Sequence, residues 1–244
     1  MAPDASHIST GTVRAALSAF GVGHVQRISR LHSGAGRARK FVVEFDEGAH
    51  GSESAHPNRR ALLKCTPRDS ASLERLTATH AVQRCLVDRG LPVAMPIADT
   101  RGGTVLADKA RVYELIPFVD GERWRASPAK AQSAGRLLAA IHAAGTGIGL
   151  PVLARLRQPR GMLAGGHLRH DGHGAGAIDD GSDAGYLRGT LGECVDRVHA
   201  AGLEAASAAA GLVHGDFHPG NMRWRGDDVI GLFDFDACRR GYAL

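Results

Sequence analysis

The sequence predicts an α+β fold built from two lobes, and three observations lead to this prediction. Residues 1–118 contain several short apolar runs with one strong helical pattern, which is typical of an antiparallel sheet with one packed helix. Residues 119–244 have a different composition and contain two helical patterns, after Ser127 and over 186–209, which predict a mainly helical second lobe. The segment 117–121, with Pro117 and Gly121 at its ends, is the predicted hinge between them.

The first lobe is expected to begin with a short helix. Thr12 is the predicted cap of this helix, and Gly21 is its predicted stop. Three strands are predicted next, at 25–31, 41–45 and 61–65.

A longer helix is predicted over 70–89, because Ala78, Val82 and Leu86 recur at helical spacing and Gly90 can end it. Further strands are predicted to complete the sheet of the first lobe. They cover 93–97, 104–106 and 112–116.

The second lobe is predicted to open with a helix that Ser127 caps, with Pro128 at its first position. A Gly- and His-rich loop is expected over 150–182, a helix over 186–209, and a short buried strand at 212–213. Three histidines of the loop are more consistent with exposed side chains than with a metal site. These are His167, His170 and His173.

The composition argues against several classes of function. The chain of 244 residues has a net charge of +5 but only 5% aromatic residues and no Lys/Arg run, which disfavours a nucleic-acid partner. It has no run of 18 apolar residues and no apolar core near Met1, so we expect neither a membrane span nor a signal peptide. The 4 cysteines show no C-x-x-C spacing, which favours free thiols in a cytoplasmic protein.

Two segments near the end carry the strongest chemical signal. The first, 214–221, contains Asp216 and Asn221, and the second begins 13 residues later (234 − 221) with Asp234 and includes Asp236. Asp216 is placed to accept the proton of a hydroxyl group, whereas Asn221 and Asp234 offer the oxygen ligands that Mg²⁺ prefers. Asp236 could add a further carboxylate near the metal. Either segment alone could be an ordinary turn.

The order Asp, four residues, Asn, and then Asp-Phe resembles the catalytic and metal loops of the aminoglycoside phosphotransferase-like and choline kinase-like family, within the protein-kinase-like superfamily. Gly215 stands where kinases usually have Arg, and Asp236 stands where they have Gly. The resemblance implies a two-lobed kinase-like fold, ATP and Mg²⁺ as cofactors, and a small hydroxyl-bearing acceptor. Asp216 would be the catalytic residue, and Asn221, Asp234 and Asp236 would hold the metal.

The resemblance also assigns nucleotide contacts in the first lobe. Lys64 ends an apolar strand, where the kinase lysine contacts the α- and β-phosphates. Family members usually carry Glu on the following helix, but His80 stands near that position here, so the partner of Lys64 is left open. His80 is counted among the nucleotide-binding residues, since its neutral imidazole could contact a phosphate, although it could also simply pack.

Two further nucleotide contacts are expected from the backbone. The turn that contains Ser33, Gly34 and Gly36 could cover the phosphates, although a plain hairpin turn explains it equally well. The backbone of Leu115 and Ile116 is the expected adenine contact.

The chain ends eight residues after Asp236 (244 − 236), whereas family members generally continue with further helices. The resemblance therefore implies a second lobe that is truncated: a fragment, a shortened product, or a small variant that forms a homodimer. Two alternatives to a small-molecule kinase stay open. The chain could phosphorylate protein Ser or Thr, or it could be an inactive nucleotide-binding module.

Overall fold

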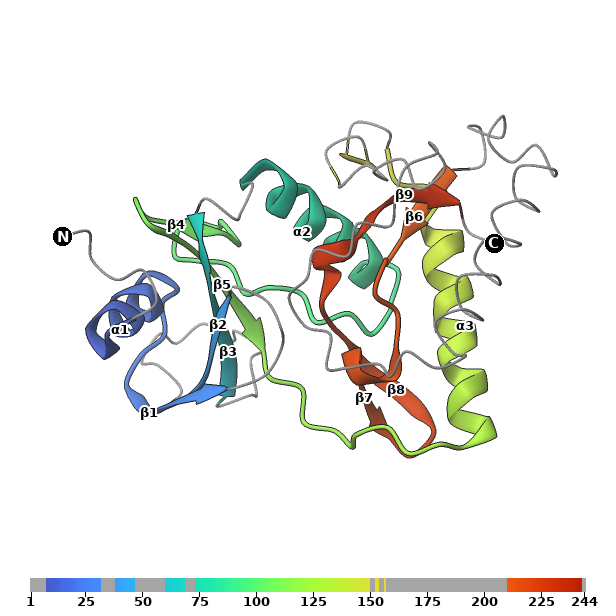
Figure 1. Ribbon diagram of the computed structural model, residues 1–244, viewed down its shortest axis with the longest axis horizontal. Helices are drawn as coiled ribbons and strands as arrows, with labels where there is room; N and C mark the ends of the chain where they lie inside the picture. The colour runs from blue at the N-terminus through green and yellow to red at the C-terminus, as the bar shows by residue number, and fades with distance from the viewer. Residues whose placement is uncertain are drawn as a thin grey trace, which may run out of the picture.

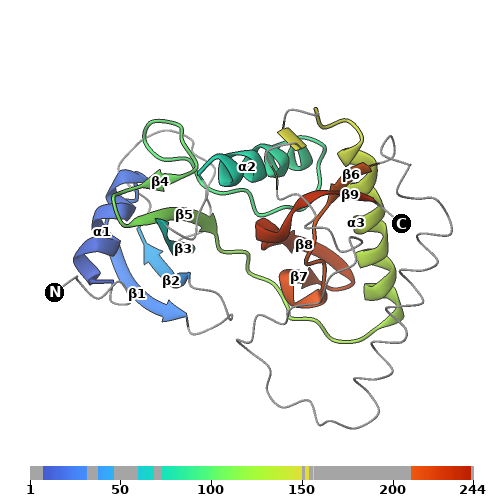
Figure 2. The same ribbon diagram turned by 45° about the horizontal axis from the view of Figure 1, so that its top comes forward.

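The structure is a computed structural model that describes residues 8–31, 38–46, 60–68, 73–149, 152–153, 156 and 210–242. A five-stranded sheet with helix α1 forms one lobe, at the left of Figure 1, and helix α3 with four short strands forms the other, at the right. Helix α2 lies between them, and Figure 2 shows the same arrangement from a second direction. The predicted α+β, two-lobed fold class is confirmed.

The sheet of the first lobe is antiparallel and has the order β1-β2-β3-β5-β4. The strand at 25–31 has its predicted bounds, and the strands predicted at 41–45, 61–65 and 112–116 are slightly longer than predicted. The strand predicted at 104–106 is shorter and is shifted to Leu106–Ala107. The five strands are β1 (Val25–Leu31), β2 (Arg39–Phe45), β3 (Arg60–Pro67), β4 (Leu106–Ala107) and β5 (Arg111–Pro117).

Helix α1 (Thr10–Ala19) covers one face of this sheet, because its buried Val13 and Leu17 share an apolar cluster with strand residues such as Val43 and Leu63. The predicted cap was wrong: Ser9 caps the helix, and the Thr12 backbone N–H donates to Ser9 Oγ at 3.1 Å.

Helix α2 (Leu73–Val87) packs its apolar side on the second lobe rather than on the sheet. Its buried Ala78, Val82 and Leu86 belong to the same cluster as Leu137 of α3. The helix therefore joins the two lobes, and its polar face is left to point toward the sheet.

The strand predicted at 93–97 does not form. Val93 makes one bridge with Leu232 and Ile97 makes one with Leu115. Pro92 and Pro96 flank and interrupt this stretch and supply no N–H, which accounts for the absence of a continuous ladder.

The second lobe begins with α3 (Pro128–Gly145), which Ser127 caps as predicted. Two antiparallel pairs follow it in the described part of the chain: β6 (Ala210–Val213) with β9 (Arg239–Tyr242), and β7 (Met222–Arg225) with β8 (Asp228–Leu232). The 3₁₀ helices η4 (Pro219–Asn221) and η5 (Phe235–Ala237) lie in the loops that carry the candidate site.

Some predictions fall outside the described residues. These are the helix at 186–209, most of the loop at 150–182 with its three histidines, and the turn with Ser33, Gly34 and Gly36. Of the cysteines that are described, Cys65, Cys85 and Cys238 are free thiols as expected, and burial raises the pKa of Cys65 and of Cys238 to about 12. None of the described helices is long and apolar enough to span a bilayer.

Candidate active site

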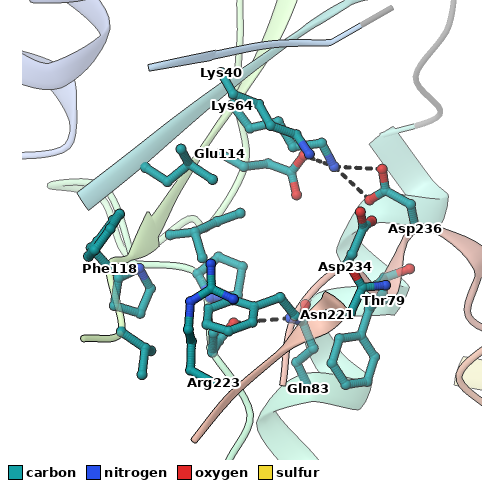
Figure 3. Close-up of a pocket in the computed structure, with 18 of the residues that line it drawn as sticks. Lys40, Lys64, Thr79, Gln83, Glu114, Phe118, Asn221, Arg223, Asp234 and Asp236 are labelled. Carbon is teal, nitrogen blue, oxygen red and sulfur yellow. Dashed lines mark hydrogen bonds and ion pairs between the residues drawn. The ribbon is translucent and has the colours of Figure 1, made fainter. Parts of the chain in front are cut away.

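A cavity of about 250 Å³ lies between the lobes and receives side chains from both (Figure 3). One end carries charged groups, and the end near Phe118 is formed by the connector between the lobes. The lining includes Lys40, Leu62, Lys64, His80, Glu114, Ile116, Pro117, Phe118, Val119, Asn221, Arg223, Phe233, Asp234 and Asp236.

His214 joins the two loops of the candidate site from a fully buried position. Its Nε2–H donates to the Phe233 carbonyl at 3.0 Å, and its Nδ1 accepts from the Asp216 backbone N–H at 3.3 Å. Burial holds the pKa of His214 below its usual value, although the Phe233 carbonyl and the Asp216 carboxylate oppose the shift. A neutral ring fits both hydrogen bonds, because only the neutral imidazole can accept at Nδ1.

Gly215 lets the loop pass against the backbone of η5. Its φ is +83°, and a Cβ atom there would lie 2.2 Å from the Ala237 carbonyl oxygen. No side chain fits this position, which explains why the Arg usual in kinases is absent here.

Asp216 and Asn221 are held together by hydrogen bonds. Asn221 Nδ2 donates to the Asp216 carbonyl and to Asp216 Oδ2, both at 2.9 Å. The amide nitrogen is thereby occupied, and Asn221 Oδ1 is the atom left for a cation. Asp216 is half exposed and lies beside the cavity rather than in its lining, so its free carboxylate oxygen can reach a molecule outside the cavity.

Asp234 follows β8 and has a φ of +62°, which makes it the one non-glycine residue with positive φ in the described part of the chain. The neighbouring Phe233 N–H donates to the Asn221 carbonyl at 2.9 Å, so the two loops are tied together beside Asp234. Backbone strain of this kind is most often kept at functional sites.

Lys64 lies at the charged end of the cavity and contacts two carboxylates. Its Nζ donates to Asp236 Oδ1 and Oδ2 at 2.6 and 2.7 Å, and it lies 3.4 Å from Glu114 Oε2 (Figure 3). Burial lowers the pKa of Lys64, but the charges of Glu114 and Asp236 outweigh burial and hold it above its usual value. The ammonium group is therefore charged.

Glu114 is a site residue that the sequence analysis missed. It lies on β5 directly opposite Lys64 of β3, and its Oε1 is 2.9 Å from His80 Nε2. His80 Nδ1 is in turn 2.7 Å from Thr104 Oγ1. The signal for it is a pair of opposite charges on neighbouring strands, which can be recognised only when the strand register is known.

Burial raises the pKa of Glu114, but the hydrogen bond from His80 and the charge of Lys64 outweigh burial and hold it below its usual value. The carboxylate is therefore charged. Because a carboxylate only accepts, His80 Nε2 must be the donor.

Two further cations line the cavity and were not predicted. Lys40 of β2 is paired with Lys64 across the sheet, which places both on the same face. Arg223 of β7 donates to the Met222 carbonyl at 2.9 Å, and its guanidinium lies 5.8 Å from the centre of the Phe233 ring. Two like charges on paired strands are unfavourable unless an anion lies near them.

Of the two residues expected to contact adenine, Ile116 reaches the cavity and Leu115 does not. Leu115 has its side chain in the core of the first lobe, and its carbonyl accepts from the Ile97 N–H at 2.7 Å. Within the described residues, no group of three His, Cys, Asp or Glu side chains is arranged to hold a metal ion. A metal here would therefore need the Asn221 oxygen together with Asp234.

Comparisons of the sequence with known proteins find relatives that are named as kinases. A homoserine kinase from Rhizobium johnstonii is 27% identical over 210 residues, which cover 80% of this chain and 62% of that protein. The stress response kinase A of Salmonella choleraesuis is 28% identical over 197 residues, which cover 76% of this chain and 54% of that protein. The chain thus spans less than two thirds of the length of these relatives.

Solved structures share the fold at low sequence identity. The amicoumacin kinase hAmiN, in complex with AMP-PNP, Ca²⁺ and Ami, superposes with a TM-score of 0.69 and 18% identity, over 98% of this chain and 66% of that one. A spectinomycin phosphotransferase with ADP and spectinomycin gives a TM-score of 0.63 and 14% identity, over 97% of this chain and 71% of that one.

Residues 26–244, most of the chain, match the family described as the phosphotransferase enzyme family. This confirms the resemblance inferred from the catalytic and metal loops. The chain belongs to the phosphotransferase enzyme family.

Proposed function

We propose that this chain binds ATP with Mg²⁺ and transfers the γ-phosphate to a hydroxyl group of a small molecule. The observation that carries the proposal is the hydrogen-bonded pair Asp216 and Asn221, which adjoins Asp234 and Lys64 at the charged end of one cavity. Phosphoryl transfer depends mainly on positioning and on stabilising charge, and this arrangement offers both.

Asp216 would orient the acceptor and take its proton. Its carboxylate lies beside the cavity and not within it, which matches a group that must reach the acceptor rather than the nucleotide. Asn221 fixes one carboxylate oxygen and leaves the other free to accept a hydrogen bond from the hydroxyl group.

Asn221 Oδ1 and the Asp234 carboxylate are the atoms that would hold the metal, with Asp236 as a further carboxylate close by. Both are hard oxygen donors, as Mg²⁺ prefers. The ion would neutralise charge on the phosphate oxygens when bound. Lys64 and Lys40 would contact the phosphates, and the apolar end near Ile116 and Phe118 would receive the base.

Small acceptors are favoured by the names of the relatives. Proteins named homoserine kinase, aminopropanol kinase and spectinomycin phosphotransferase all share this fold or family. A second candidate, a protein kinase, is favoured by one relative named serine/threonine protein kinase RdoA, from Salmonella typhimurium, which is 28% identical over 197 residues.

An acceptor screen with γ-labelled ATP and Mg²⁺ tests the proposal. The panel should hold homoserine, aminopropanol, spectinomycin and a Ser/Thr-rich protein, each with the wild type and with Asp216→Asn. We expect label on a small hydroxyl compound with the wild type, and a loss of about 10²–10⁴-fold with the variant, whose amide is no base. Label on the protein alone would support the second candidate, and turnover by the variant at the wild-type rate would contradict the role of Asp216.

A further inference from the structure

The lysine at the charged end of the cavity is anchored in an unusual way. Helix α2 supplies no carboxylate to Lys64 in the described contacts, because His80 stands where the family resemblance leads us to expect Glu. The two carboxylates that Lys64 contacts come from β5 and from the metal loop, as Glu114 and Asp236. Only one of them can be the permanent partner if the nucleotide phosphates are to reach the ammonium group.

Burial separates the two carboxylates. The Glu114 side chain is 5% exposed, whereas that of Asp236 is 49% exposed. Glu114 is almost fully buried, and a buried carboxylate without its cation is strongly unfavourable. Asp236 can turn into solvent, where its charge is hydrated, so its contact with Lys64 is the one that can be given up.

A chain of buried hydrogen bonds fixes Glu114 from behind. His80 Nε2 donates to Glu114 Oε1, which leaves Oε2 as the oxygen that faces Lys64. The Thr104 hydroxyl lies 2.7 Å from His80 Nδ1 and holds the ring in place. His80 on the polar face of α2 thus acts on Lys64 through the Glu114 carboxylate. Each group in this row of hydrogen bonds has a partner.

We propose that Glu114, oriented by His80, positions Lys64 for the phosphates of the nucleotide, and that Asp236 is a temporary partner which the phosphates displace. The inference rests on the proposed nucleotide site. It assigns Glu114 and His80 as positioning residues, since both act through Lys64 and neither needs to touch the nucleotide. An entering phosphate would repel the exposed Asp236 carboxylate and take its place on Nζ.

Binding of ADP in the presence of EDTA tests the inference, because without metal any role of Asp236 as a metal ligand drops out. Calorimetry would compare the wild type with Glu114→Gln and Asp236→Asn, which remove one negative charge each and are nearly isosteric. We expect Glu114→Gln to weaken ADP binding by about tenfold, since Lys64 is then drawn to Asp236 alone. Asp236→Asn should leave the affinity unchanged or raise it.

A pure charge effect of Glu114 predicts the opposite change in ADP affinity for Glu114→Gln. If Glu114 acted only through its negative charge, its removal would tighten the binding of an anion. Tighter or unchanged binding by Glu114→Gln would therefore overturn the inference while the nucleotide site itself stood. Failure of the wild type to bind ADP or Mg²⁺–ATP would instead overturn the proposed function and this inference with it.

Two further variants separate positioning from a general loss of structure. His80→Leu should weaken ADP binding, and His80→Gln should restore most of it, because the glutamine amide can donate from about the place of Nε2. In a Lys64→Met background, Glu114→Gln should have no further effect on affinity. An equal effect in both backgrounds would show that Glu114 does not act through Lys64, and melting temperatures would confirm that each variant is folded.

Discussion

At the scale of single residues, Gly215 shows how tightly the two loops of the site are packed. Its left-handed backbone and the 2.2 Å approach of the Ala237 carbonyl to a built Cβ are two separate obstacles to a side chain. Gly226 has only the first obstacle, because its φ is +57° but nothing lies within 4 Å of a built Cβ. The two glycines are therefore a matched pair.

We predict that Gly215→Ala destabilises the protein by more than Gly226→Ala. The latter should cost only the backbone term of about 1–2 kcal/mol, whereas the former must also move the loop that carries Asp216. Urea unfolding would measure both free energies, and the transfer assay should show loss of activity in Gly215→Ala alone. Equal costs at the two positions would mean that the loop relaxes freely.

Glu114 gives the stability of the protein a dependence on pH. Its pKa in the folded state lies below the ordinary value of 4.5, so the folded form binds this proton less readily than the unfolded chain. The stabilisation is fully present above about pH 4.5 and is lost as the pH falls toward the lower, folded-state pKa.

We therefore predict a shallower acid limb for Glu114→Gln. Below the ordinary pKa, the free energy of unfolding of the wild type should fall more steeply with pH than that of the variant. The difference in slope can reach one proton, or about 1.4 kcal/mol per pH unit. Urea titrations at a series of acidic pH values would measure it, and parallel limbs would contradict the charged state assigned to Glu114.

At the scale of elements, local signals predicted most helices and strands correctly. Ser127 before Pro128 predicted the start of α3, and the strand predicted at 25–31 matches β1 at both bounds. The failures had other causes. Pairing decides whether 93–97 becomes a strand, and two prolines prevent it; the choice of Ser9 over Thr12 as a cap depends on local geometry that composition does not specify.

The site shows the same division. Asp216 and Asn221 were predicted from their characteristic spacing, and Lys64 from its place at the end of an apolar strand. Glu114, Lys40 and the reach of Asp236 to Lys64 could not be predicted, because they depend on strand register and on a contact between residues 172 positions apart.

Helix α3 contains two glycines whose substitution should have opposite effects. A Cβ atom at Gly145 would lie 2.5 Å from Leu212 Cβ, whereas at Gly135 it would meet nothing within 4 Å. We predict that Gly135→Ala stabilises the protein by up to about 1 kcal/mol, since alanine is the better helix former. Gly145→Ala should destabilise it by about 1–3 kcal/mol through overpacking against β6. Urea unfolding of both variants would measure the two effects, and a gain at Gly145 would mean that β6 can move away.

At the scale of the whole molecule, the two apolar clusters do not divide the chain at the connector. One cluster is built from α1 and the sheet, and the other contains α2 together with α3 and the strands of the second lobe. Helix α2 precedes the connector in the sequence, but it packs against the second lobe, which follows the connector. The candidate nucleotide cavity lies where the sheet, α2, the connector and the loop with Asp234 and Asp236 meet.

This arrangement predicts that nucleotide and metal stabilise the whole molecule together. ATP would contact Lys64 from the sheet side, and the metal would join its phosphates to Asn221 and Asp234 of the second lobe. Bound ligand stabilises the folded state by RT ln(1 + [L]/Kd), which is about 2.7 kcal/mol at a hundredfold excess over Kd. Thermal unfolding should therefore shift upward with ATP and Mg²⁺ together, by more than the two separate shifts combined.

Asp234→Asn is the control for this experiment. Asn tolerates the left-handed backbone at this position, so the variant removes the charge without adding strain. It should keep the melting temperature of the free protein and lose the extra shift that needs both ligands. A full combined shift in the variant would mean that the metal is held elsewhere. The charged end and the connector end of the cavity are already in place without ligand. Absence of any shift in the wild type would therefore mean that these residues do not form a nucleotide site by themselves.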